Sequence, residues 1–347
     1  MKKALIVLLI LAVAGGLFAQ EWGGSVTTGL LFDFSKDAKD ETPIPVTGND
    51  DDSGDAVHGS LWFEHAEDEW GVKIKTGAAI STGLTLNNAW GWINFADGLV
   101  KLSAGKMDDG VWGSGGEYDH DWSNDGILRV EIKPTDELDI GLAFSFPNWD
   151  DNEYKAGKIG NFFQQTIIGA KYTADTFFVA TALKLHSEED TSYPTDKDMD
   201  AGWYFGVGYT GIEGLEINVD GGIEYLTRMS DIGVETFWLK VAYTGIDSLT
   251  VGAKAGFGFI KSFELNGFDA GVWVEYAVSD AVSVGADVGL AANKDFAFTG
   301  YSFDAWAKYT AGNAWMKGVV GADITTKDSD DGEATKPYFK LIFGFDF

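Results

Sequence analysis

Five tyrosines recur at nearly constant spacing along the second half of the chain. They are Tyr172, Tyr209, Tyr243, Tyr276 and Tyr309, with spacings of 37, 34, 33 and 33 residues. Each tyrosine closes a run of alternating apolar and polar residues and precedes a short turn, after which a second alternating run begins. A period of two is typical of strands, and two strands joined by a tight turn form a hairpin. The repeat therefore predicts a series of antiparallel β-hairpins.

These hairpins predict an all-β fold, a transmembrane antiparallel β-barrel. Apolar residues on one side of each strand, with an aromatic residue beside each short turn, are typical of a barrel that crosses an outer membrane. Mean hydropathy is only −0.06, because lumen-facing residues dilute the lipid-facing ones in such strands. The 45 Gly and 49 aromatic residues, against six Pro, also favour a large β-architecture.

The number of short turns predicts 18 strands, with both ends of the chain in the periplasm. A count of 16 is the alternative, if Ser81 to Trp90 does not form a loop and a strand start. Longer, acidic connections such as 35–56, 107–126 and 187–200 are expected to be external loops. The eight short turns are predicted at residues 67–69, 97–98, 134–137, 174–175, 211–214, 245–248, 279–280 and 311–314.

The first 19 residues have the pattern of a cleaved signal peptide. Lys2 and Lys3 precede an apolar run from Ala4 to Ala19, which is short for a membrane-spanning helix and ends in small residues that suit cleavage. The prediction is therefore export to the outer membrane, with residues 20–347 as one barrel domain. Cleavage would lower the net charge from −29 to −31, which makes nucleic acid a poor partner. The chain has no Cys, so it has no disulfides or thiolate metal sites.

The sequence resembles the Gram-negative porins over essentially its whole mature length. The resemblance rests on the hairpin repeat, on Gly105-Lys106 before a long loop, and on the closing segment from Lys340 to Phe347. It implies a water-filled channel for small hydrophilic solutes and ions in the lipid bilayer, commonly as a homotrimer. It also implies an assembly signal at Lys340, Phe345 and Phe347 that the barrel-assembly machinery reads, although Ile342 stands where that signal has Gly.

The resemblance also implies that the loop at 107–126 folds into the barrel and narrows the pore. The loop is acidic, contains several glycines, and carries aromatic residues that could pack against the inner wall. The alternative is an external loop that caps the barrel. The candidate constriction residues are Asp108, Asp109, Trp112, Glu117, Tyr118, Asp119 and Asp121.

Strand parity places charged residues of opposite sign on two parts of the inner wall. Such sectors would create a transverse field, whereas the simpler interpretation is that the charges are solvated and pair across strands. Acidic loops predict a mild preference for cations in either case. The inward basic residues are Lys73, Lys75, Lys101, Arg129, Lys133 and Lys171, accompanied by Glu131 and Asp139. The inward acidic residues are Glu216, Asp220, Glu224, Asp269, Glu275, Asp287, Asp304 and Asp323, accompanied by Lys240, Lys254, Lys308 and Lys317.

Several tryptophans also fall on the inward parity, where they could stack on sugar rings, as in the sugar-selective maltoporins. The alternative is that they fill space along the wall or brace the loop. They are Trp62, Trp90, Trp92, Trp238, Trp273, Trp306 and Trp315.

No cofactor or specific metal site is predicted, and His120 with its flanking acids is weak evidence for an enzyme. A structural or adhesive barrel without an open pore is the third alternative.

Overall fold

The computed structural model describes residues 21–34, 44–46, 57–79, 83–107, 111–113, 126–145, 165–187, 199–224, 233–260, 264–326 and 333–347. The first nine strands are β1 (Glu21–Asp33), β2 (Ile44–Val46), β3 (Val57–Ala66), β4 (Trp70–Ala79), β5 (Gly83–Phe95), β6 (Val100–Lys106), β7 (Gly126–Thr135), β8 (Leu138–Ser145) and β9 (Gln165–Thr173). The others are β10 (Phe177–Ser187), β11 (Met199–Ile212), β12 (Leu215–Glu224), β13 (Gly233–Ile246), β14 (Leu249–Ile260), β15 (Glu264–Ser279), β16 (Val282–Asn293), β17 (Phe298–Ala311), β18 (Ala314–Thr325) and β19 (Ala334–Asp346).

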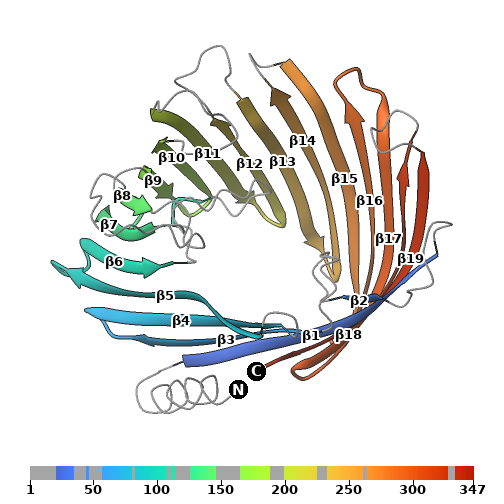
Figure 1. Ribbon diagram of the computed structural model, residues 1–347, viewed down its shortest axis with the longest axis horizontal. Helices are drawn as coiled ribbons and strands as arrows, with labels where there is room; N and C mark the ends of the chain where they lie inside the picture. Colours follow the sequence, from blue (N-terminus) through green and yellow to red (C-terminus); the bar gives the residue numbers. More distant parts are fainter. Residues whose placement is uncertain are drawn as a thin grey trace.

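The strands form one closed antiparallel barrel (Figure 1). Each strand from β3 to β19 pairs with the next, and β1 closes the ring by pairing with both β3 and β19. The three-residue β2 pairs with Gly29–Leu31 of β1, on the side of β1 where β3 has already ended. Without β2 the ring has 18 strands. The predicted fold and strand number are therefore confirmed, and the alternative of 16 is wrong because 83–95 forms β5.

All eight predicted short turns connect neighbouring strands at one end of the barrel. At the turn after β5, Ala96, Asp97 and Gly98 all have positive φ, a conformation that Gly adopts without steric cost. The signal peptide and most of the acidic segments lie outside the described residues.

Aromatic residues form two belts on the outer surface. The five repeated tyrosines lie near the short-turn ends of β9, β11, β13, β15 and β17, with exposed side chains. At the other end, ring contacts join Phe257 to Phe268 and Phe268 to Phe296. On β15 the two belts are eight residues apart, from Phe268 to Tyr276, or about 27 Å along the strand. Two aromatic girdles around an apolar band are typical of an outer-membrane barrel.

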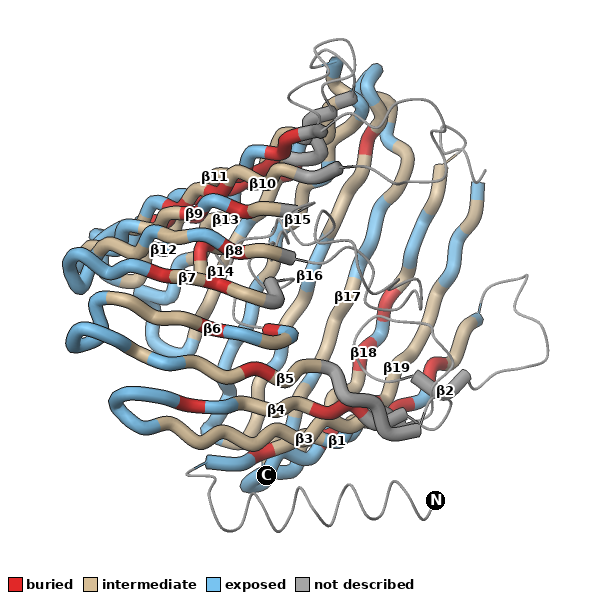
Figure 2. Tube along the Cα trace, turned by 60° about the vertical axis from the view of Figure 1, so that its left-hand side comes forward, coloured by how far each residue is buried: buried red, intermediate tan, exposed pale blue. Residues whose placement is uncertain are grey.

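Buried residues are few, as Figure 2 shows, and many of them lie on the inner wall around β7–β11. One cluster contains Ala143 of β8, Ile167 of β9, Ala180 and Ala182 of β10, and Tyr204 of β11. A barrel of this kind buries little between its strands, because stability comes mainly from the closed hydrogen-bond ladder. Burial on the inner wall therefore marks places where neighbouring side chains or another part of the chain cover the wall.

Candidate functional site: the inner wall of the barrel

The inner face of each strand is identified by the exposed apolar residues on its other face. On β15, the exposed Val272, Val274 and Tyr276 alternate with Trp273 and Glu275, so the latter two point into the lumen. The same reasoning places every described residue of the predicted basic set on the inner wall of β4, β6, β7 or β9. The described acids of the predicted acidic set lie on the inner wall of β12 and β15–β18, and the Glu224 side chain lies outside the described residues.

Each inward tryptophan lies directly opposite a glycine on a neighbouring strand. A Cβ atom on Gly252 would be 2.0 Å from the ring of Trp273, and one on Gly285 would be 2.4 Å from the ring of Trp306. These rings therefore lie flat against the wall, in space that only glycine leaves open. The opposed pairs are Trp62 with Gly23, Trp90 with Gly105, Trp92 with Gly71, Trp238 with Gly256, Trp273 with Gly252, Trp306 with Gly285 and Trp315 with Gly344.

A lysine ammonium lies over each of these seven indoles. The distance from Nζ to the ring centroid ranges from 4.7 to 5.8 Å, which suits a cation–π contact. The pairs are Lys73 with Trp62 and Trp90, Lys101 with Trp92, Lys240 with Trp273, Lys254 with Trp238, Lys308 with Trp315 and Lys317 with Trp306. The wall tryptophans thus combine a glycine on one neighbouring strand with an ammonium group over the ring.

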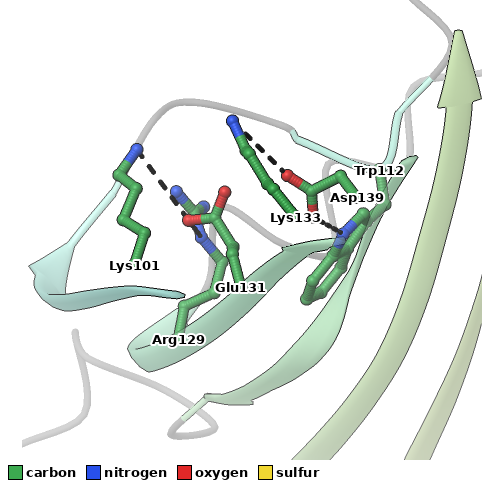
Figure 3. A network of polar contacts seen from close by, with 6 residues as sticks. All are labelled: Lys101, Trp112, Arg129, Glu131, Lys133 and Asp139. Carbon is green, nitrogen blue, oxygen red and sulfur yellow. Dashed lines mark hydrogen bonds and ion pairs between the residues drawn. The ribbon is translucent and has the colours of Figure 1, made fainter. Parts of the chain in front are cut away.

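On β6–β8 the charged residues pair with one another (Figure 3). Glu131 Oε2 accepts a hydrogen bond from Arg129 Nε at 3.0 Å and lies 3.8 Å from Lys101 Nζ. Both Arg129 and Glu131 are completely buried. Lys133 Nζ lies 3.7 Å from Asp139 Oδ2. Pairing across strands, the simpler of the two interpretations of the sequence, therefore occurs in this part of the wall.

The segment 111–113, which follows β6, lies against the inner wall. Trp112 is 1% exposed and packs into the cluster on β8–β11. Its Nε1 donates a hydrogen bond to Asp139 Oδ1 at 3.1 Å, and Lys171 Nζ donates one to Gly113 O at 3.1 Å. A Cβ atom on Gly169 would be 2.1 Å from the Trp112 ring, so the wall is hollowed where the indole lies.

Gly105, near the end of β6, has a backbone conformation that requires glycine. Gly105 has φ of +124°, and a Cβ atom there would be 2.2 Å from the carbonyl oxygen of Ala89. Any other residue would therefore be strained and would clash with β5. Just beyond β6, Met107 is 1% exposed, and its carbonyl oxygen accepts a hydrogen bond from Asn88 Nδ2 at 3.0 Å. The other candidate constriction residues, Asp108, Asp109, Glu117, Tyr118, Asp119 and Asp121, lie outside the described residues.

Sequence reasoning missed two features of the wall. Glu64 of β3 is also inward and lies 3.2 Å from Lys73 Nζ, so the basic part of the wall carries three acids rather than two. Strand parity could have found it, because Trp62 on the same strand is inward. The glycines beneath the tryptophans were also missed, because finding them requires the register between strands.

The described part of the chain contains no helix long and apolar enough to cross a membrane. No protein-family model matches the sequence, and no curated protein does.

Solved structures do match. A triple mutant of the Rhodopseudomonas blastica porin has a TM-score of 0.54 at 14% identity, over 94% of this chain and 99% of that one. A double mutant of the same porin gives 0.54 at 16% identity, with the same coverage. A loop-deletion mutant of OmpT, an outer membrane protein of Vibrio cholerae, gives 0.51 at 15% identity, over 94% and 98% of the two chains. The resemblance to porins is therefore confirmed at the level of the fold.

Proposed function

We propose that this protein is an outer-membrane porin, which forms a water-filled channel for passive diffusion of small hydrophilic solutes and ions. The observation that carries the proposal is the division of the barrel into an apolar outer face with two aromatic belts and a charged inner face. Inward carboxylates such as Asp269, Glu275, Asp287 and Asp323 are exposed. An exposed charge inside a closed barrel requires water around it, because an unhydrated carboxylate is very costly.

A mild cation preference follows from the uneven distribution of charge. The basic residues of β4–β9 are partly neutralised by Glu64, Glu131 and Asp139. The acids of β12 and β15–β18 outnumber the four lysines on β13, β14, β17 and β18. In Figure 1 the strands β4–β7 and β16–β18 lie on opposite sides of the lumen. A lumen with these two sides would hold solute cations near the acidic one.

Segment 111–113 supports a role for the loop between β6 and β7 as the constriction. Its indole is pinned to the inner wall of β8–β11 rather than to the barrel's outside. The acidic residues of this loop would then lie on a segment that Trp112 attaches to the inner wall. They are Asp108, Asp109, Glu117, Asp119 and Asp121. Their role at the narrowest part of the pore remains part of this proposal.

The test is single-channel recording with refolded mature protein in a planar bilayer under a KCl gradient. The expected result is discrete conductance steps with a reversal potential biased toward K⁺. A folded barrel that inserts and stays electrically silent would contradict the proposal and favour a structural or adhesive barrel. Replacement of the five loop acids by Asn or Gln is expected to reduce the cation bias, and an unchanged reversal potential would place the loop outside the pore.

A sugar-selective channel is less favoured by the wall geometry. Sugar stacking requires a free indole face, whereas each inward indole lies under a lysine ammonium and all of them except Trp90 also lie over a glycine. Export by a signal peptide, insertion by the barrel-assembly machinery and assembly into a homotrimer are also proposals, and they rest on the sequence resemblance. Phe347 of the predicted assembly signal contacts Trp22 and exchanges backbone hydrogen bonds with Gly24, where the barrel closes.

A further inference from the structure

Two lysines lie directly opposite each other on the inner wall of neighbouring strands. Lys308 of β17 and Lys317 of β18 are cross-strand partners. Like charges at directly opposed positions destabilise a sheet. On their other sides the two lysines face Ser283 of β16 and Ile342 of β19, which carry no charge. Two positive charges therefore lie on neighbouring strands of a strongly acidic protein, and no residue directly opposite either lysine is acidic.

The lysines that lie over indoles on β4 and β6 differ from these two, because each of them has a carboxylate partner. Lys73 and Lys101 also lie over indoles, but Lys73 is 3.2 Å from Glu64 Oε2 and Lys101 is 3.8 Å from Glu131 Oε2. Among the described residues, no carboxylate forms an ion pair with Lys308 or Lys317. These two ammonium groups therefore keep their capacity to bind an anion from the lumen.

The two ammonium groups are held in position by rigid neighbours. Lys308 Nζ lies 4.9 Å from the ring centroid of Trp315, and Lys317 Nζ lies 4.7 Å from that of Trp306. The Trp306 ring is fixed over Gly285, and its Nε1 donates a hydrogen bond to Asp287 Oδ2 at 3.1 Å. The Trp315 ring is fixed over Gly344. Two preoriented cations lose less side-chain entropy on binding a ligand than two free lysines would.

We propose that Lys308 and Lys317 form a luminal binding subsite for an oxyanion, the carboxylate or phosphate group of a small solute. Lys308 Nζ lies over Trp315, on the short-turn side of the lysine pair, and Lys317 Nζ lies over Trp306, on the other side. An oxyanion at this part of the wall would accept a charge-assisted hydrogen bond from either ammonium group and would reduce the repulsion between the two. Each lysine is three residues from the short turn between β17 and β18, so the subsite lies near that end of the lumen. As a step in solute passage it rests on the proposed porin function, whereas binding itself does not.

A second pair of opposed lysines lies on β13 and β14, which are separated from the first pair by β15 and β16. Lys240 of β13 is directly opposite Lys254 of β14, and these lysines lie over Trp273 and Trp238. The sequence signal is a tryptophan two residues before a lysine on one strand, as in Trp306-Ala307-Lys308, Trp315-Met316-Lys317 and Trp238-Leu239-Lys240. Recurrence at two places indicates a repeated feature of the inner wall rather than an isolated pair.

The test measures anion binding to the folded protein in detergent micelles at low salt, where screening is weak. Inorganic phosphate is followed by phosphorus NMR line broadening, and gluconate by proton saturation transfer. Saturable binding of at least one probe is expected, and the probe that binds identifies the oxyanion. The variant K308Q/K317Q is expected to lower the apparent affinity at least about tenfold, because it removes both charged donors.

Two further variants make the result specific. K308R/K317R keeps both charges, and since a guanidinium also stacks on aromatic rings and donates to oxyanions, this variant is expected to bind at least as tightly as the parent protein. K336Q removes an inward lysine at the far end of β19, opposite Asp323, and is expected to leave the affinity unchanged. Absence of saturable binding, or equal binding by K308Q/K317Q, would overturn the subsite. A parent protein that binds phosphate and conducts no ions supports the subsite and contradicts the porin proposal, whereas one that conducts without binding does the reverse.

Discussion

Trp112 and Asp139 are joined by a hydrogen bond from Nε1 to Oδ1 at 3.1 Å, although 27 residues separate them in the chain. Asp139 also lies 3.7 Å from Lys133 Nζ, so one carboxylate holds both the wall and the segment that follows β6. The indole lies in a hollow that Gly169, Ala143, Ala180 and other small residues create. The wall of β8–β10 is therefore shaped to receive this tryptophan.

Replacement of Trp112 by Ala is expected to release segment 111–113 from the wall. Truncation of a buried tryptophan typically costs about 3–5 kcal/mol, and Asp139 would lose a hydrogen bond as well. Single-channel recordings should show greater open-channel noise and a broader distribution of conductance levels. Trp203→Ala is the control, because its indole lies on the outer face of β11 and is 40% exposed. Identical traces for Trp112→Ala and the parent protein would show that this segment does not shape the pore.

A second prediction concerns the glycines beneath the wall tryptophans. Gly252→Ala would place a Cβ atom 2.0 Å from the Trp273 ring, and overpacking of this kind typically costs about 1–3 kcal/mol. The expected result is a lower unfolding midpoint in denaturant. In the double variant Gly252→Ala/Trp273→Ala the added methyl group has no ring to clash with and fills part of the space that Trp273 leaves. The double variant should therefore be more stable than Trp273→Ala alone. Gly318→Ala is the matched control, since the nearest atom to its added Cβ is 3.9 Å away, and a loss of equal size there would contradict the steric explanation.

The architecture could be predicted from the sequence because the alternation of residues and the turn residues are local features of the chain. Asp97-Gly98 and the other short turns, together with the tyrosines, predict the hairpins and hence the number of strands. Strand parity also predicts which side chains of β15 face the lumen. These inferences succeed because a shift of one residue would place a whole apolar face in water.

Features that depend on pairing between strands could not be predicted in the same way. The partner of Trp273 is Gly252, and the partner of Lys308 is Lys317, and neither pairing can be read from one strand alone. Parity could have placed Glu64 on the inner wall, but its contact with Lys73 depends on the register between β3 and β4. The position of Trp112 depends on a loop that returns to the wall, and its local sequence does not specify that direction.

The division of faces leads to a third prediction. Val272 lies midway between the belt residues Phe268 and Tyr276 on the outer face of β15 and is 56% exposed. Val272→Arg is expected to destabilise the barrel in a lipid bilayer by about 2–4 kcal/mol, because the charge would lie near the membrane midplane. Thr250→Arg places the same charge on the inner face of neighbouring β14, opposite Glu275. Reversible denaturant titrations in lipid should show a much smaller loss there, and equal losses would contradict the assigned faces.

The opposed carboxylates of Asp287 and Asp304 provide the sharpest test of cation preference. These side chains are direct cross-strand partners on the inner wall of β16 and β17. Asp287 Oδ2 accepts a hydrogen bond from Trp306 Nε1, and Asp304 Oδ1 accepts one from Tyr338 OH at 2.6 Å. Asn keeps an acceptor oxygen at both positions, so Asp287→Asn/Asp304→Asn removes two charges while these hydrogen bonds can persist.

In a KCl gradient the double variant is expected to shift the reversal potential toward zero, because less negative charge would attract K⁺ into the lumen. The shift should be largest at low salt, where the Debye length exceeds about 10 Å. Asp247→Asn is the control, since it removes a carboxylate in the exposed turn between β13 and β14. A shift of equal size for Asp247→Asn would mean that the overall charge of the protein sets the selectivity. A shift confined to the double variant would assign it to the acidic wall of the lumen.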